Sequence, residues 1–60
     1  MEKTYYKILR RYEKKGEYFI EISFSDDPEG FFMPCVITGE TEEIAESGLK
    51  DFLGEHAKQI

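Results

Sequence analysis

The chain has 60 residues and a formal net charge of −5, with 40% hydrophobic and 35% charged residues. A chain of this length buries only about 60% of the surface that it exposes when unfolded, so we expect residues 1–60 to form one domain that gains stability by self-association. Five Phe and four Tyr make the chain too aromatic for a disordered tail. The single Cys35 excludes an internal disulfide, and the sequence contains no signal-like or membrane-spanning apolar segment, so we expect a cytoplasmic protein.

Charge is distributed unevenly along the chain. Residues 1–15 carry six basic and two acidic side chains, a net charge of +4, whereas residues 16–60 carry two basic and eleven acidic side chains, a net charge of −9. Dense carboxylates disfavour contact with a phosphate backbone and favour a basic protein partner. The basic start leaves nucleic-acid binding open, although alternating Lys and Arg equally suit the solvated face of a strand. We therefore expect a protein partner rather than nucleic acid.

The first predicted element is a strand over residues 4–12, whose imperfect alternation is typical of an edge strand. A strict period of two would place Tyr6, Ile8, Arg10 and Tyr12 on one face, and Tyr5, Lys7, Leu9 and Arg11 on the other. Residues 13–16 then predict a hairpin turn, because they are polar and end in Gly16, which can adopt a positive φ.

Two further strands are predicted. The strand over residues 17–24 has the clearest alternation, with an apolar face that holds Tyr18, Ile20, Ile22 and Phe24. Asp, Pro and Gly crowd residues 25–30 and predict a turn. The strand over residues 31–38 is almost uniformly apolar, so both of its faces should be covered, one by a helix and one by a partner chain. Pro34 cannot donate a backbone hydrogen bond and favours an edge position or a bulge.

An amphipathic helix is predicted after Gly39. Thr41 can cap its first N–H groups, and acidic residues in its first turn complement the positive end of the helix dipole. The apolar stripe that should cover the sheet consists of Ile44, Ala45, Leu49, Phe52, Leu53 and Ala57. Gly48 either permits close packing or weakens the helix, and Gly54 is expected to fray its last turn. The predicted fold is thus α+β, in the order β-β-β-α, with one helix packed on one face of a three-stranded antiparallel sheet.

A series of short motifs runs through these elements in order. The motif positions are Gly16, Tyr18, Phe24, Asp26, Pro28, Gly30, Cys35, Gly39, Glu40, Thr41 and Ala45. Together they resemble the HicB-like antitoxin domain, in which a strand ending in Phe is followed by a Pro-Asp-x-Pro-Gly turn, a Cys or small residue, and Gly-Asp-Thr at a helix start. The likeness spans most of residues 5–53 and departs from the pattern at Ser25, at Glu29 and in residues 31–34.

The resemblance implies a non-enzymatic antitoxin that blocks a small basic RNase toxin of the HicA type by steric occlusion. The candidate contact residues are the acidic Asp26, Asp27 and Glu29 and the apolar Phe31, Phe32 and Met33. Three adjacent large apolar residues cannot all point inward from one strand, so another chain should cover some of them. That chain is either a second copy, in a homodimer paired through residues 31–38, or a basic partner. Members of the family usually continue into a fourth strand and often a DNA-binding segment, neither of which we expect in residues 54–60.

Other functions stay open. A phage-type inhibitor that mimics nucleic acid and blocks a host defence nuclease, or a housekeeping homodimer, is compatible with the same small acidic chain. The acidic turn could bind a divalent cation, but it lacks the ligand spacing of a calcium loop. His56 has no partner in a catalytic or metal-binding arrangement and is expected at the surface, and Cys35 is expected to be a small buried hydrophobe. We therefore expect no catalytic residue, metal or cofactor.

Overall fold

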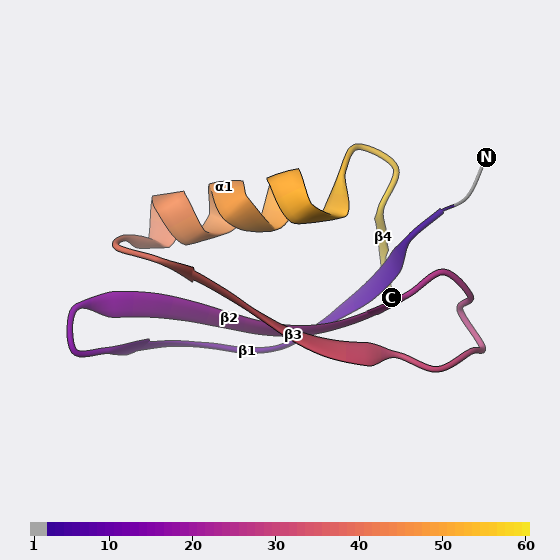
Figure 1. Ribbon diagram of the computed structural model, residues 1–60, viewed down its shortest axis with the longest axis horizontal. Helices are drawn as coiled ribbons and strands as arrows, with labels where there is room; N and C mark the ends of the chain where they lie inside the picture. Colours follow the sequence, from indigo (N-terminus) through magenta and orange to yellow (C-terminus); the bar gives the residue numbers. More distant parts are fainter. Residues whose placement is uncertain (1–2) are drawn as a thin grey trace.

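This computed structural model describes residues 3–60 of the chain, which contain four strands and one helix. In chain order they are β1 (Tyr5–Lys14), β2 (Glu17–Ser25), β3 (Met33–Gly39), α1 (Glu42–Leu53) and β4 (Lys58–Gln59). The strands form one sheet in the order β3-β2-β1-β4. Figure 1 shows α1 lying lengthwise over one face of this sheet. The predicted α+β class with a single covering helix is confirmed for these residues.

The hairpin between β1 and β2 turns at Lys15 and Gly16, which both have positive φ, 53° and 77°. Two consecutive positive φ values are typical of the tight two-residue turn whose twist matches that of paired strands. The predicted hairpin is confirmed, although β1 runs two residues further than Tyr12 before it turns.

An irregularity in β1 changes which side chains share a face. The register between β1 and β2 shifts between Ile8 and Arg10, so Leu9 is an extra residue in the strand. Beyond this bulge Arg11 points toward α1, where its guanidinium reaches Glu46, and Arg10 points to the opposite side. The face assignment predicted from a strict period of two is therefore wrong after Ile8.

The sheet has a fourth strand that the sequence did not predict. Within β4 the N–H of Lys58 donates to the carbonyl of Thr4 at 2.8 Å, and the following Ile60 N–H donates to the carbonyl of Tyr6 at 2.9 Å. This pairing is parallel, so the sheet is mixed rather than purely antiparallel. It covers only Tyr5 and Tyr6, so the predicted edge position of β1 is wrong for these two residues and holds for the rest of the strand. A two-residue strand carries no readable alternation, which is why β4 could not be predicted from the sequence.

The core lies between β2 and α1. Its buried apolar members are Ile20, Ile22, Ala45 and Leu49, and Ile8, Tyr18, Cys35, Ile37 and Leu53 pack against them. The helix-facing alternation of β2 is thus confirmed. The predicted helix stripe is too wide, because Ile44 and Phe52 are exposed and Ala57 lies beyond the helix. Only a narrow stripe is buried because α1 packs mainly on β2 and β3.

Both ends of α1 are capped. The Oγ1 of Thr41 accepts a hydrogen bond from the N–H of Ile44 at 3.2 Å, as predicted. At the other end the N–H of Gly54 donates to the carbonyl of Lys50 at 2.9 Å, and Gly54 has a φ of 78°. Gly54 therefore closes the helix instead of fraying it, because a residue without Cβ adopts this backbone angle freely. No helix within residues 3–60 is long and apolar enough to cross a membrane.

Gly39 and Gly48 lie where α1 meets the sheet, and they differ in the space available for a side chain. A Cβ at Gly39 would lie 2.6 Å from the backbone nitrogen of Ala45, a distance that requires the backbone to move. A Cβ at Gly48 would lie 3.4 Å from Cγ2 of Ile37, an ordinary contact. Close approach of the chain thus requires glycine at position 39 and not at position 48.

Candidate partner-binding site

The acidic turn between β2 and β3, residues 25–30, is held by its own polar groups. The Oγ of the buried Ser25 accepts a hydrogen bond from the N–H of Asp27 at 3.1 Å. The Oδ1 of Asp27 accepts one from the N–H of Glu29 at 3.0 Å, and the N–H of Gly30 donates to the carbonyl of Asp27 at 3.0 Å. Asp27 therefore shapes the turn, whereas the side chains of Asp26 and Glu29 are exposed.

A pocket of about 330 Å³ lies beside this turn. Its lining residues are Thr4, Phe24, Ser25, Asp26, Phe31 and Met33. The side chain of Phe31 is 81% exposed, and that of Met33 is also open to solvent. The pocket thus combines exposed apolar walls with an acidic residue, Asp26.

Three of the six predicted contact residues line this pocket: Asp26, Phe31 and Met33. Asp27 and Glu29 belong to the same turn but do not line the pocket. Phe32 contacts a different part of the molecule, because the Nζ of Lys7 lies 4.6 Å from the centroid of its ring. Successive side chains of an extended segment point to opposite sides, which explains why Phe32 is separated from its two neighbours.

Two pocket residues have no obvious signal in the sequence. Phe24 was predicted on the apolar face of the second strand and as a motif position but not as a contact residue, and its ring meets Phe52 of α1 edge to face, with centroids 5.2 Å apart. Thr4 precedes β1, and its carbonyl accepts the hydrogen bond from Lys58 in β4. Both positions depend on long-range packing, so the pocket becomes recognisable only when the sheet and helix are assembled.

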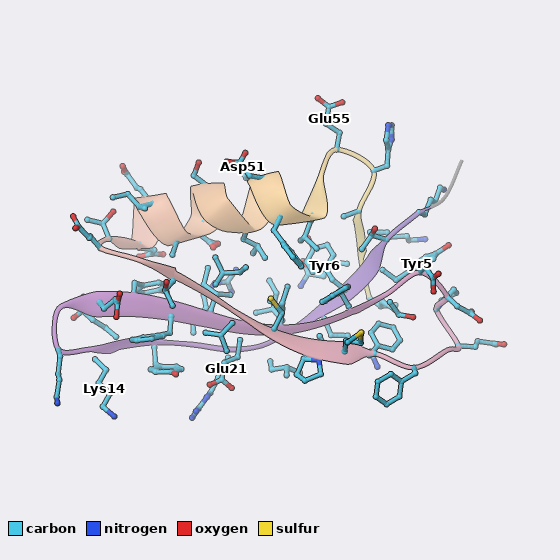
Figure 2. All side chains as sticks on the ribbon, viewed as in Figure 1. Tyr5, Tyr6, Lys14, Glu21, Asp51 and Glu55 are labelled. Carbon is cyan, nitrogen blue, oxygen red and sulfur yellow. The ribbon has the colours of Figure 1, made fainter. Side chains whose placement is uncertain are left out.

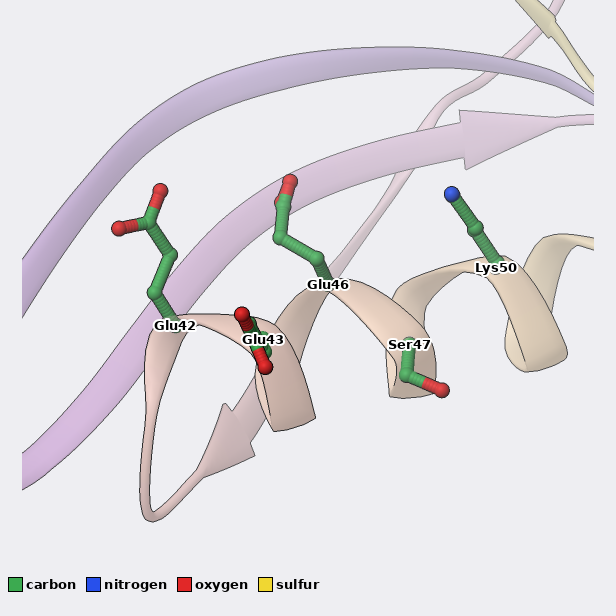
Figure 3. Close-up of a pocket in the computed structure, with 5 residues that line it drawn as sticks. All are labelled: Glu42, Glu43, Glu46, Ser47 and Lys50. Atoms are coloured by element: carbon green, nitrogen blue, oxygen red, sulfur yellow. The ribbon is translucent and has the colours of Figure 1, made fainter.

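A second acidic surface lies on α1. A hollow of about 540 Å³ is lined by Glu42, Glu43, Glu46, Ser47 and Lys50. Figure 3 shows Glu42, Glu46 and Lys50 in a row along one side of the helix. The guanidinium of Arg11 lies 3.1 Å from the Glu46 carboxylate, and this hydrogen bond raises the pKa of Arg11 above its usual value. Cations thus interrupt this acidic row at two places.

The other singled-out residues lie in unremarkable surroundings. Cys35 was expected to be buried; it packs against the core but is only half-buried. His56 is exposed in the turn after α1. Across the described part of the chain, no three or more His, Cys, Asp or Glu side chains are grouped to hold a metal ion.

Comparison with known proteins identifies no relative of this chain. No protein-family model matches it, and neither a curated protein nor a solved structure is significantly similar to it. The resemblance to HicB-like antitoxins therefore rests on the motif residues alone and stays a prediction.

Proposed function

We propose that this protein is a non-enzymatic binding protein that holds a basic protein partner at the pocket beside its acidic turn. The observation that carries the proposal is the placement of Asp26 among the apolar pocket residues Phe24, Phe31 and Met33. Lys and Arg have an apolar stem and a charged tip. The stem would contact the apolar walls, and the tip would pair with the carboxylate of Asp26.

The exposure of Phe31 supports a role in binding. A Phe side chain that is 81% exposed contributes little to the stability of the isolated fold. Large aromatic side chains that become buried at the centre of an interface contribute much of its binding energy. Phe31 is therefore the expected apolar anchor, with Asp26 setting the preference for a cation.

Within this class, we propose a HicB-like antitoxin that occludes a small basic RNase toxin of the HicA type. The motif positions in the sequence support this assignment. The arrangement of elements also agrees with it, because members of that family continue into a fourth strand after the helix, and β4 occupies that place here. Inhibition would be stoichiometric and steric, since binding alone would cover the toxin's RNA-binding surface.

Mimicry of nucleic acid remains the second candidate, with a host defence nuclease as its target. It would use Asp51 of α1 and Glu55 in the turn after the helix, which project away from the sheet in Figure 2, together with other carboxylates of α1. The Arg11–Glu46 ion pair and Lys50 interrupt that surface, which makes it a poorer copy of a continuous row of phosphates. The pocket beside the acidic turn has stronger support for this reason.

The test is a titration of purified protein into a panel of HicA-type toxins, followed by calorimetry and by RNA cleavage. We expect saturable binding, inhibition that is complete at a fixed molar ratio, and association that slows as salt is raised, because charge complementarity steers the encounter. Absence of binding to every toxin in the panel would contradict the antitoxin assignment.

Three variants locate the site. Phe31→Ala should weaken binding at least tenfold, about 1.4 kcal/mol, and Asp26→Asn should weaken it by a similar or somewhat smaller factor. Asp51→Asn is the matched control, because it removes the same charge from the exposed side of α1 and should leave affinity nearly unchanged. Equal losses for Asp26→Asn and Asp51→Asn would contradict the pocket and favour the mimic.

A further inference from the structure

The face of the sheet that α1 does not cover, here called the open face, has a distinct composition. Figure 2 shows Lys14 and Glu21 pointing away from the helix on this side. Residues directly opposite each other in antiparallel strands share a face, so Lys14 shares the open face with Glu17 of β2. By the same register the face also holds Lys7, Arg10, Tyr12, Phe19, Pro34, Val36 and Thr38.

The centre of the open face is ordered by stacking and by an ion pair. The rings of Tyr12 and Phe19 are stacked with centroids 4.9 Å apart, and the guanidinium of Arg10 lies 4.6 Å from the centroid of the Tyr12 ring. Arg10 also reaches the carboxylate of Glu21 at 2.9 Å. That hydrogen bond lowers the pKa of Glu21, so the carboxylate stays charged. The face therefore presents a preformed apolar and charged surface.

The edge of the open face is apolar and uncharged. β3 contains no charged residue, and its Val36 side chain is 51% exposed. Solvent-exposed edge strands usually carry charged residues that prevent association. An edge strand without charged side chains therefore favours a cover over this side of the sheet.

Charge follows a self-complementary pattern on the open face. Its cations, Lys7, Arg10 and Lys14, all come from β1, and its carboxylates, Glu17 and Glu21, come from the neighbouring β2. The two copies can be related by a two-fold axis that lies between their open faces, parallel to the strands and midway between β1 and β2. Rotation about this axis would place each copy's β1 over its partner's β2. The cationic row of one copy would then face the acidic row of the other, with the aromatic centres in contact.

We propose that the open face is the interface of a homodimer, in which a second copy of this chain packs its own open face against the first about this axis. α1 lies over the sheet along the intermediate dimension of the molecule, and the other two dimensions of the whole molecule are 37 and 13 Å between Cα atoms (Figure 1). The open face therefore offers at most about 500 Å² before side chains are counted, which is less than the roughly 600 Å² that each partner buries in the smaller specific complexes. The dimer should accordingly dissociate in the micromolar range.

The stacking geometry argues for a second copy over single-stranded nucleic acid as the occupant. Bases bind sheet faces by stacking on exposed aromatic rings between basic residues. Here the ring of Tyr12 is already stacked on Phe19 and contacted by Arg10, and two carboxylates lie within the same surface. A protein face that carries both cations and carboxylates can pair with both kinds of charge on this surface, whereas a polyanion can pair only with the cations.

The first test is the concentration dependence of the molar mass by sedimentation equilibrium. The wild type should change from 7.1 kDa to twice that mass as its concentration rises through the micromolar range. Val36→Lys should raise the dissociation constant at least tenfold. The matched control is Ile44→Lys on α1, since Ile44 is exposed to the same extent, 52%, and this variant should dimerise as the wild type does. Circular dichroism checks that both variants fold.

The second test exchanges charges and distinguishes this geometry from others. Arg10→Glu makes the central charges of the open face all acidic, and Glu21→Arg makes them all basic, so each variant alone should be monomeric. An equimolar mixture should form heterodimers, because each acidic face then meets a basic one. Neither substitution touches the pocket beside the acidic turn, so binding of a toxin partner tests the proposed function separately.

Several results would overturn the proposal. A wild type that stays at 7.1 kDa to millimolar concentration excludes the dimer. A dimer that survives Val36→Lys, or a mixture of charge variants that stays monomeric, excludes this face and indicates pairing through another surface, such as the edge of β3. Binding of an oligonucleotide in competition with self-association at physiological salt would identify nucleic acid as the occupant instead.

Discussion

The two faces of β2 are built from neighbouring residues yet hold the structure together by different means. Toward α1, Ile20 and Ile22 are completely excluded from solvent. On the open face, Phe19 and Glu21 alternate with them and contact Tyr12 and Arg10 across the hairpin. One face thus gains stability from excluding water, and the other from stacking and ion pairing that form in the presence of water. The first kind of contact maintains the fold, and the second leaves a surface available to a partner.

The largest expected effect comes from emptying the core on the helix side. Ile20→Ala should lower the free energy of unfolding by about 2–4 kcal/mol, because a fully buried side chain is lost and a cavity remains. Val36→Ala, the control on the open face, should cost less than about 1 kcal/mol. Urea denaturation of both variants measures the difference, and equal losses would contradict the contrast between the two faces.

A second prediction concerns how closely α1 approaches the sheet. Gly39→Ala should lower the free energy of unfolding by about 1–3 kcal/mol, because the new Cβ would lie 2.6 Å from the backbone nitrogen of Ala45. Gly48→Ala, where the contact distance is 3.4 Å, should instead raise it by about 0.5–1 kcal/mol through helix propensity. Thermal denaturation followed by circular dichroism tests the pair, and the same sign for both would refute the distinction.

The stacking of Tyr12 on Phe19 on the open face should contribute less to the free energy of unfolding than a core residue does. A double-mutant cycle with Tyr12→Ala and Phe19→Ala should give a coupling energy of about 0.5–1.5 kcal/mol, typical of aromatic pairs. Denaturation at a fixed low protein concentration keeps self-association out of the measurement. A coupling near zero would mean that the two rings, stacked at 4.9 Å, do not stabilise each other.

The smallest expected effect is a change in acid sensitivity. Arg10 holds the pKa of Glu21 in the folded chain below its ordinary value of 4.5, so the unfolded chain takes up this proton at a higher pH. The stability that the Arg10–Glu21 pair contributes is therefore fully present above pH 4.5. It is lost as the pH falls through the lowered pKa of Glu21 in the folded chain. Glu21→Gln and Arg10→Gln should each flatten the loss of stability in acid, measured by denaturation at a series of pH values. Unchanged pH dependence in both would show that this exposed pair contributes nothing.

The parts of the fold that could be predicted from the sequence depend on local signals. Alternation in residues 17–24 identified the buried face of β2, and Thr41 identified the start of α1, because a strand period and a helix cap are both readable within a few residues. The acidic turn was likewise evident from its Asp, Pro and Gly residues.

The remaining features depend on contacts between distant segments. The bulge at Leu9 exists only relative to the register with β2, and it moves Tyr12 to the open face. Alternation along the segment separates Phe32 from Phe31, but the contact of Phe32 with Lys7 of β1 forms only when the sheet is assembled. For the same reason the candidate site was predicted only in part: the acidic and apolar residues were identified, but not which of them share a pocket.

The parallel pairing of β4 with β1 has a consequence for local motion. It joins Thr4 to Lys58, positions near opposite ends of the described chain, and Thr4 also lines the pocket beside the acidic turn. A two-residue strand with exposed side chains should detach at a lower free energy than global unfolding requires. The amide hydrogens of Lys58 and Ile60 should therefore exchange with solvent deuterium faster than those of the β1–β2 hairpin, and each such opening also frees one wall of the pocket.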